Sequence, residues 1–174
     1  MKIIYVHHAL REKNIVPNQD DDILPLGVKD AVLTGKLLEV LHKTSKIKAI
    51  YTSPYLRCRK TAIIINKRIN APIIDEPRLN EFNNVFKRLR GESTPSESET
   101  WEECQSRIMQ AIKDIVLRHD DDDVVVCVTS GVNIAAFINI AFGIPPNNNA
   151  PFLHIPSCSP IGFNLNKSMF EKSI

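Results

Sequence analysis

The chain has 174 residues, of which 43% are hydrophobic and 24% are charged. Its 22 basic and 20 acidic residues give a net charge of +2, which points to neither nucleic acid nor an anionic membrane as a partner. A chain of this length buries a core without structural metal or disulfides, so we predict one domain over residues 1–174.

No secretory signal or membrane span is predicted. The apolar run after Lys2 lasts four residues before two histidines, and the apolar stretch 134–144 is interrupted and short. We therefore expect a cytoplasmic protein, with an oligomeric state that the sequence leaves open. Four widely spaced cysteines without a CxxC pair are expected to be reduced core thiols: Cys58, Cys104, Cys127 and Cys158.

The first half of the chain alternates between strand and helix patterns. Residues 2–6 form an apolar β-type run, and a helix is predicted after Gly27, with one apolar face made of Val28, Ala31, Leu38 and Leu41. A strand over 49–52 leads into Ser53 and Pro54, which are typical of a helix N-cap and first helical position. This second helix is predicted to reach residue 69, and a strand follows over 72–75.

The second half begins with residues 82–98, a polar segment that we expect to be a surface excursion. A helix over 100–118 is indicated by Thr100 and Glu103, which fit a capping box, and by an apolar face of Trp101, Cys104, Ile108, Ala111 and Ile115. The run 124–129, apolar up to Thr129, predicts a buried strand, and a helix over 131–142 and a strand over 161–165 follow.

Strands separated by helices predict an α/β fold, a three-layer αβα sandwich with a mainly parallel central sheet. Ligands bind such sheets beyond the carboxyl ends of the strands. We therefore expect three pairs of polar residues to meet at one rim: His7 with His8, Thr52 with Ser53, and Thr129 with Ser130.

The segments VHHALREKN, TSPYLRCRKTA, LNEF and VVVCVTSGVNIAAF resemble, in order and spacing, the motifs of the histidine phosphatase superfamily, which includes the phosphoglycerate mutases. The family's opening motif is Arg-His-Gly-Glu-Thr-x-x-Asn. This sequence keeps its histidine as His8 and its asparagine as Asn14, whereas His7 stands for the arginine and Arg11 for the threonine.

The second motif, Ser-Pro-x-x-Arg-x-x-x-Thr-Ala, is kept from Ser53 to Ala62 and includes Arg57. Glu81 matches the glutamate of the family's Leu-x-Glu. In the Ser/Thr-His-Gly motif, Ser130 replaces the second active-site histidine.

The resemblance implies that His8 attacks a phosphoryl group and forms a phosphohistidine, with Arg57 stabilising charge and Glu81 protonating the leaving group. His7, Arg11, Asn14 and Ser130 are the corresponding candidates for substrate binding. A protonated His7 supplies a positive donor, and Arg11 is a candidate to replace the missing arginine because it follows the nucleophile. Ser130 is equally well explained as a helix N-cap. No metal and no cofactor are expected.

Two functions remain open at this point. One is hydrolysis of a phosphorylated small molecule, weak or specialised because the arginine and second histidine are replaced. The other is a catalytically inactive relative that binds a phosphorylated small molecule or a protein partner. A mutase is disfavoured because it must protect its phosphoenzyme from water. Selectivity is expected from segments 82–98 and 145–155.

Three further features are interpreted without a function. The acidic runs 20–22 and 119–123 are expected to be solvated turns. His7 and His8 are not expected to pair on a metal, because neighbouring residues of a strand point to opposite faces. Nothing in the sequence places His154 at the rim.

Overall fold

The computed structural model describes residues 1–12, 21–82, 99–144 and 154–171. A five-stranded sheet runs through them in the order β3-β2-β4-β1-β5. The strands are β1 (Lys2–His7), β2 (Ile47–Thr52), β3 (Ile73–Asp75), β4 (Val124–Thr129) and β5 (Pro160–Asn164). The first four are parallel and β5 pairs antiparallel with β1, which confirms the prediction of a mainly parallel sheet.

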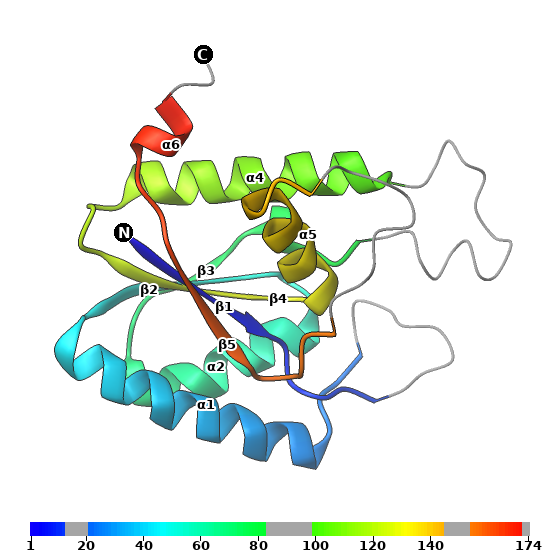
Figure 1. Cartoon of the computed structure of the whole chain (residues 1–174). Helices are drawn as coiled ribbons and strands as arrows, with labels where there is room; N and C mark the ends of the chain where they lie inside the picture. The colour runs from blue at the N-terminus through cyan, green and yellow to red at the C-terminus, as the bar shows by residue number, and fades with distance from the viewer. Residues whose placement is uncertain (13–20, 83–98, 145–153, 172–174) are drawn as a thin grey trace, which may run out of the picture.

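Helices cover both faces of the sheet (Figure 1). Helices α1 (Pro25–Thr44) and α2 (Leu56–Ile69) lie on one face, and α4 (Trp101–Arg118) and α5 (Gly131–Ala141) lie on the other. A short 3-10 helix η1 (Pro77–Leu79) follows β3, and α6 (Ser168–Glu171) follows β5. The predicted αβα sandwich is therefore confirmed.

Alternation along β1 divides the core in two. Ile3 and Tyr5 pack with α4 and α5, whereas Ile4 and Val6 pack with α1 and α2. Because side chains of a strand alternate between the faces, a run that is apolar at every position must be covered on both. All six residues of β4 are buried, as expected for the central strand of such a sheet.

Helix α4 matches its sequence pattern. All five residues of the predicted apolar face are buried, and Thr100 and Glu103 form the capping box. The amide of Glu103 donates to the Thr100 hydroxyl over 3.1 Å, and the Thr100 amide donates to the Glu103 carboxylate over 2.7 Å. The four cysteines are free and buried, which confirms the prediction of reduced core thiols.

Two local predictions are wrong. Val28, which was expected on the apolar face of the first helix, is 38% exposed. The buried face of α1 is instead made of Leu38 and four small residues, Gly27, Ala31, Thr34 and Gly35. Ser53 does not cap α2, which begins at Leu56 after Tyr55. Ser53 instead continues the pairing of β2 with β4 through its amide, and its hydroxyl donates to the side-chain oxygen of Asn80 over 2.7 Å. Residues 83–98 of the predicted surface excursion lie outside the described residues.

Candidate active site

The carboxyl ends of β1, β2 and β4 lie side by side, as predicted. Backbone hydrogen bonds continue past the strands: the His8 amide donates to the Thr129 carbonyl over 2.9 Å, and the Ser53 amide donates to the Val128 carbonyl over 3.0 Å. The chain therefore turns away from the sheet at the same level on three neighbouring strands. This edge is where a parallel sheet presents side chains to a ligand.

His8 is buried immediately after β1, with 6% of its surface exposed. Its Nδ1 donates to the carbonyl of Ala9 over 2.8 Å, so in the neutral ring Nε2 carries the lone pair. Burial lowers the pKa of His8 well below its ordinary value of 6.5, and repulsion by the charge of His7 lowers the pKa further. A neutral imidazole with a free Nε2 lone pair is the form that a nucleophile requires.

His7 and His8 lie closer than the strand pattern predicts. The chain leaves β1 after His7, and the two rings meet edge to face with centroids 4.5 Å apart. His7 donates from Nδ1 to the carbonyl of Ile155 over 2.7 Å. Burial lowers its pKa too, and that hydrogen bond partly opposes the change. The expectation that the rings point to opposite faces was wrong, because alternation ends where the strand ends.

The ring of His7 packs against Gly131. A Cβ atom at position 131 would lie 3.1 Å from Cε1 of His7. The absence of a side chain at the first residue of α5 thus makes room for the imidazole. Ser130, directly before it, is 1% exposed and caps α5 by accepting the Asn133 amide over 3.4 Å, which confirms the interpretation as an N-cap.

Arg57 lies in the first turn of α2 and is 2% exposed. Its Nη2 donates to the carboxylate of Glu81, and its guanidinium lies 5.0 Å from the centre of the Tyr55 ring. The two charged residues that the family motifs predict to be catalytic are thus brought together from positions 24 apart in sequence. A buried arginine with a carboxylate partner is a preorganised source of positive charge.

Thr61 connects α2 to the loop after His8. Its hydroxyl donates to the carbonyl of Arg57 over 2.6 Å and accepts the amide of Ala9 over 2.9 Å. Arg57 and Thr61 are four residues apart and therefore share one helix face. The spacing of this motif allows one helical turn to present the arginine and hold the backbone next to His8.

The segment carrying Glu81 is anchored through its backbone. The Thr129 hydroxyl donates to the Leu79 carbonyl over 2.6 Å, and Nδ2 of Asn133 donates to the carbonyls of Leu79 and Asn80 over 2.9 and 2.8 Å. Arg107 of α4 also donates to the Asn80 carbonyl over 3.0 Å. The sequence predicted that Thr129 lies at the rim because it ends a strand. It gave no indication that Asn133 and Arg107 bind the backbone of this segment.

Arg11 is paired with a carboxylate. Its Nη1 donates to Asp21 over 2.8 Å and to the backbone carbonyl of Glu12 over 2.9 Å. Asp21 is 2% exposed, so the prediction that the whole acidic run 20–22 is solvated was wrong. A buried carboxylate needs a paired cation, and Arg11 meets that need. Asn14 lies outside the described residues.

A pocket of about 480 Å³ opens over His7. Its other lining residues are Leu10, Glu81, Gly131, Val132, His154, Ile155, Pro156 and Ser157. The pocket therefore combines a candidate catalytic carboxylate, the first turn of α5 and two imidazoles. His154 was missed as a rim residue because its position depends on contacts between segments far apart in the chain.

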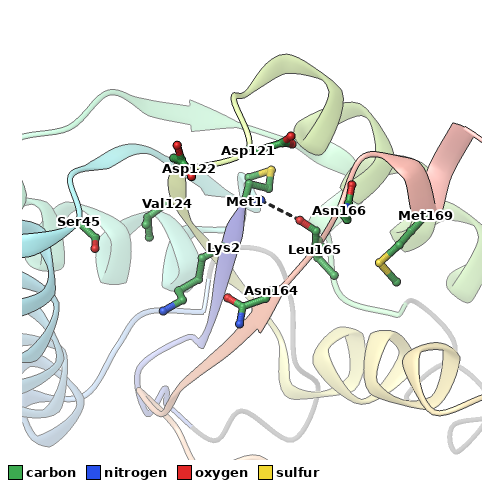
Figure 2. A pocket seen from close by; sticks show the side chains of 10 residues that line it. All are labelled: Met1, Lys2, Ser45, Asp121, Asp122, Val124, Asn164, Leu165, Asn166 and Met169. Carbon is green, nitrogen blue, oxygen red and sulfur yellow. Dashed lines mark hydrogen bonds between the residues drawn. The ribbon is translucent and has the colours of Figure 1, made fainter.

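A second pocket, of about 420 Å³, lies at the opposite edge of the sheet. Figure 2 shows it around Met1 and Lys2 at the start of β1, beside Asn164 and Leu165 at the end of β5. The N-terminal amine of Met1 donates to the Leu165 carbonyl over 2.8 Å. None of the residues predicted to act on phosphate lines it.

Three further observations concern the described residues. In these ranges, no group of three or more His, Cys, Asp or Glu side chains is arranged to hold a metal ion. Asp120, Asp121 and Asp122 are exposed, as expected for a solvated turn. No helix within residues 1–12, 21–82, 99–144 and 154–171 is both long enough and apolar enough to cross a membrane.

The fold and the pocket over His7 define an α/β protein whose candidate site lies at the carboxyl edge of a mainly parallel sheet. The family model of the histidine phosphatase superfamily (branch 1) matches residues 6–85 and 83–171. The chain belongs to this superfamily, which confirms the resemblance seen in the motifs.

Solved structures agree on the fold. YhfR of Bacillus stearothermophilus has a TM-score of 0.80 and 22% identity, and the match covers 95% of this chain and 91% of that chain. A putative alpha-ribazole-5'-P phosphatase from Escherichia coli has a TM-score of 0.76 and 15% identity, with coverages of 96% and 92%.

A mycobacterial glucosyl-3-phosphoglycerate phosphatase has a TM-score of 0.75 and 18% identity, with coverages of 92% of this chain and 88% of that chain. No curated protein sequence matches the chain significantly. At these identities the structural likeness establishes the fold, and the chemistry has to be argued from this chain's own residues.

Proposed function

We propose that the protein hydrolyses a phosphorylated small molecule through a phosphohistidine at His8. The observation that carries the proposal is the hydrogen bond from Nδ1 of His8 to the Ala9 carbonyl, which leaves Nε2 as the nucleophilic atom of a neutral ring. The buried Arg57 supplies fixed positive charge for the phosphoryl oxygens. The pocket of about 480 Å³ that His7 and Glu81 line has a size that suits a small-molecule substrate.

The reaction proceeds in two steps. In the first, the substrate phosphate takes the place of Glu81 on Arg57 and Glu81 takes up a proton; Nε2 of His8 then forms a bond to phosphorus while the bond from phosphorus to the leaving oxygen breaks, and Glu81 gives its proton to that oxygen. In the second, a water molecule attacks phosphorus, its proton passes to Glu81, and the bond from nitrogen to phosphorus breaks. Phosphate and an alcohol are the products, and both residues return to their starting states.

A non-catalytic binding function is the second candidate, and one specific observation favours it. Arg57 donates to Glu81 and Arg11 donates to Asp21, so both arginines that influence His8 are already paired with carboxylates. His7 and Ser130, which replace the family's arginine and histidine, carry no permanent charge. Loss of a charge-stabilising donor typically costs about 10²–10³ in rate.

Intact-mass spectrometry separates the two functions. Wild type is incubated briefly with a small aryl phosphate, and the phosphate adduct and the released phenol are measured together with those of His8→Ala and of His119→Gln, which changes a histidine outside the pocket. The phosphatase proposal expects an adduct and turnover in wild type and His119→Gln that disappear in His8→Ala. Neither signal in wild type, with phosphate still raising its melting temperature, would overturn catalysis in favour of binding.

A further inference from the structure

The segment 154–158 is held against the end of β1. His7 donates from its ring to the Ile155 carbonyl over 2.7 Å, and the His7 carbonyl accepts the Cys158 amide over 2.9 Å. On the other side of the segment, the Thr34 hydroxyl of α1 donates to the Cys158 carbonyl over 2.6 Å. Three hydrogen bonds to two different elements fix the backbone next to His154.

His154 consequently lines the pocket together with His7 and Glu81. Its side chain is exposed, whereas the Ile155 side chain that follows it is buried in the core. A positive charge on His154 lowers the pKa of His7 by repulsion, so the two imidazoles are within electrostatic range of each other. The imidazole of His154 therefore lies at the mouth of the pocket.

Position 130, where the family has its second histidine, does not supply an imidazole. Ser130 is buried, and its hydroxyl oxygen accepts the Asn133 amide at the start of α5. Among the described residues that line the pocket, His7 and His154 are the two imidazoles. The ring of His7 uses its Nδ1 on Ile155, whereas His154 has an exposed ring that can turn toward a ligand.

We infer that His154 is a substrate-binding residue that donates a hydrogen bond to the bound phosphoryl group, and so provides from the segment before β5 the second imidazole that position 130 lacks. This inference rests on the phosphate site of the proposed function. A hydrogen bond to a charged group contributes about 1.5–3 kcal/mol, which corresponds to roughly 10-fold to 100-fold in affinity.

The test is the affinity for orthovanadate and for inorganic phosphate, measured by calorimetry. His154→Gln should bind vanadate roughly 10-fold or more weakly than wild type with an unchanged melting temperature, because the side chain is exposed. His154→Arg, which keeps a hydrogen-bond donor at this position, should retain affinity. The control His119→Gln should bind as wild type.

A second measurement needs no substitution in the site. In protein labelled at the histidine rings, vanadate should shift the imidazole resonances of His154. Unchanged affinity in His154→Gln together with unshifted resonances would overturn the inference, and a His8 phosphate adduct in the same preparation would leave the proposed hydrolysis standing. Weakened binding in His154→Gln without any His8 adduct would support the hydrogen bond from His154 to the anion and overturn the proposed hydrolysis. Wild type that binds neither anion would overturn both.

Discussion

The two sides of the candidate site hold their polar groups in different ways. On the α2 side, Arg57, Thr61 and Glu81 are joined by an ion pair and by hydrogen bonds to the neighbouring backbone. On the α5 side, His7 and Ser130 stand where the superfamily has an arginine and a histidine. His7 donates to the distant Ile155 carbonyl, and Ser130 accepts the nearby Asn133 amide. The side that keeps the family's residues also has permanent charge, whereas the other side depends on groups that are neutral near neutral pH.

The residues of the two sides are therefore expected to contribute differently to stability and to chemistry. The α2 side links one helix to two loops, so its residues contribute to stability as well as to any reaction. The α5 side presents the imidazole of His7, which lies against Gly131 and whose charge depends on pH. Substitutions on the two sides are therefore expected to change stability and ligand binding in different proportions.

The largest effect is expected for Arg57→Gln. The substitution removes a buried charge that pairs with Glu81, so the free energy of unfolding should fall by about 3 kcal/mol and phosphate binding should weaken. Urea denaturation measures the first quantity and calorimetry the second. The matched control is Arg59→Gln, because the Arg59 side chain is 55% exposed and its pair with Asp75 contributes about 1 kcal/mol or less. Equal losses in both variants would show that the buried Arg57 pair contributes no more than the exposed Arg59 pair.

Gly131→Ala tests the packing of the α5 side. The added Cβ would lie 3.1 Å from the His7 ring, so we expect displacement of that ring and a loss of about 2 kcal/mol, although alanine is the better helix former. In Gly162→Ala nothing lies within 4 Å of the added atom, so its stability should change by about 0.5 kcal/mol or less. Thermal denaturation of the pair gives the comparison, and a Gly131→Ala protein as stable as wild type would contradict the tight packing.

Thr61→Val tests a single hydrogen bond on the α2 side. Valine keeps the shape but leaves the buried Ala9 amide without its acceptor, so a loss of about 1 kcal/mol in unfolding free energy is expected. Thr44→Val removes an exposed hydroxyl that donates to the Leu41 carbonyl and should change stability less. If the two valine variants unfold at the same urea concentration, Thr61 does not hold the loop after His8.

Stability should also depend on pH. The pKa values of His7 and His8 are lowered in the folded chain, so the unfolded chain binds more protons as the pH falls below 6.5. Stability should therefore decrease from neutral to acid pH, by at most about 1.4 kcal/mol per pH unit for each ring.

His8→Gln should make this decrease shallower, because one of the two rings no longer takes up a proton. Urea denaturation at about pH 7.5 and about pH 5.5 measures the slope, and Lys46→Gln, at an exposed position outside the pocket, serves as the control. A slope in His8→Gln equal to that of wild type would show that burial does not disfavour protonation of this ring.

The sequence by itself determined the parts of the protein that rest on local patterns. Hydrophobic periodicity located the strands and helices, the capping box located the start of α4, and the spacing of Ser53 to Ala62 identified the superfamily. These signals can be read locally because helix and strand each repeat side-chain direction with a fixed period. The same reasoning predicted that the ends of β1, β2 and β4 meet at one edge.

Only the tertiary structure decided how the side chains at that edge are used. The approach of His7 to His8, the pairing of Arg11 with Asp21 and the arrival of His154 at the pocket depend on where the backbone leaves a regular element and on what it then meets. The bond from His7 to Ile155 joins residues 148 positions apart. No local period encodes such a contact, because it forms only after the sheet and its covering helices have packed.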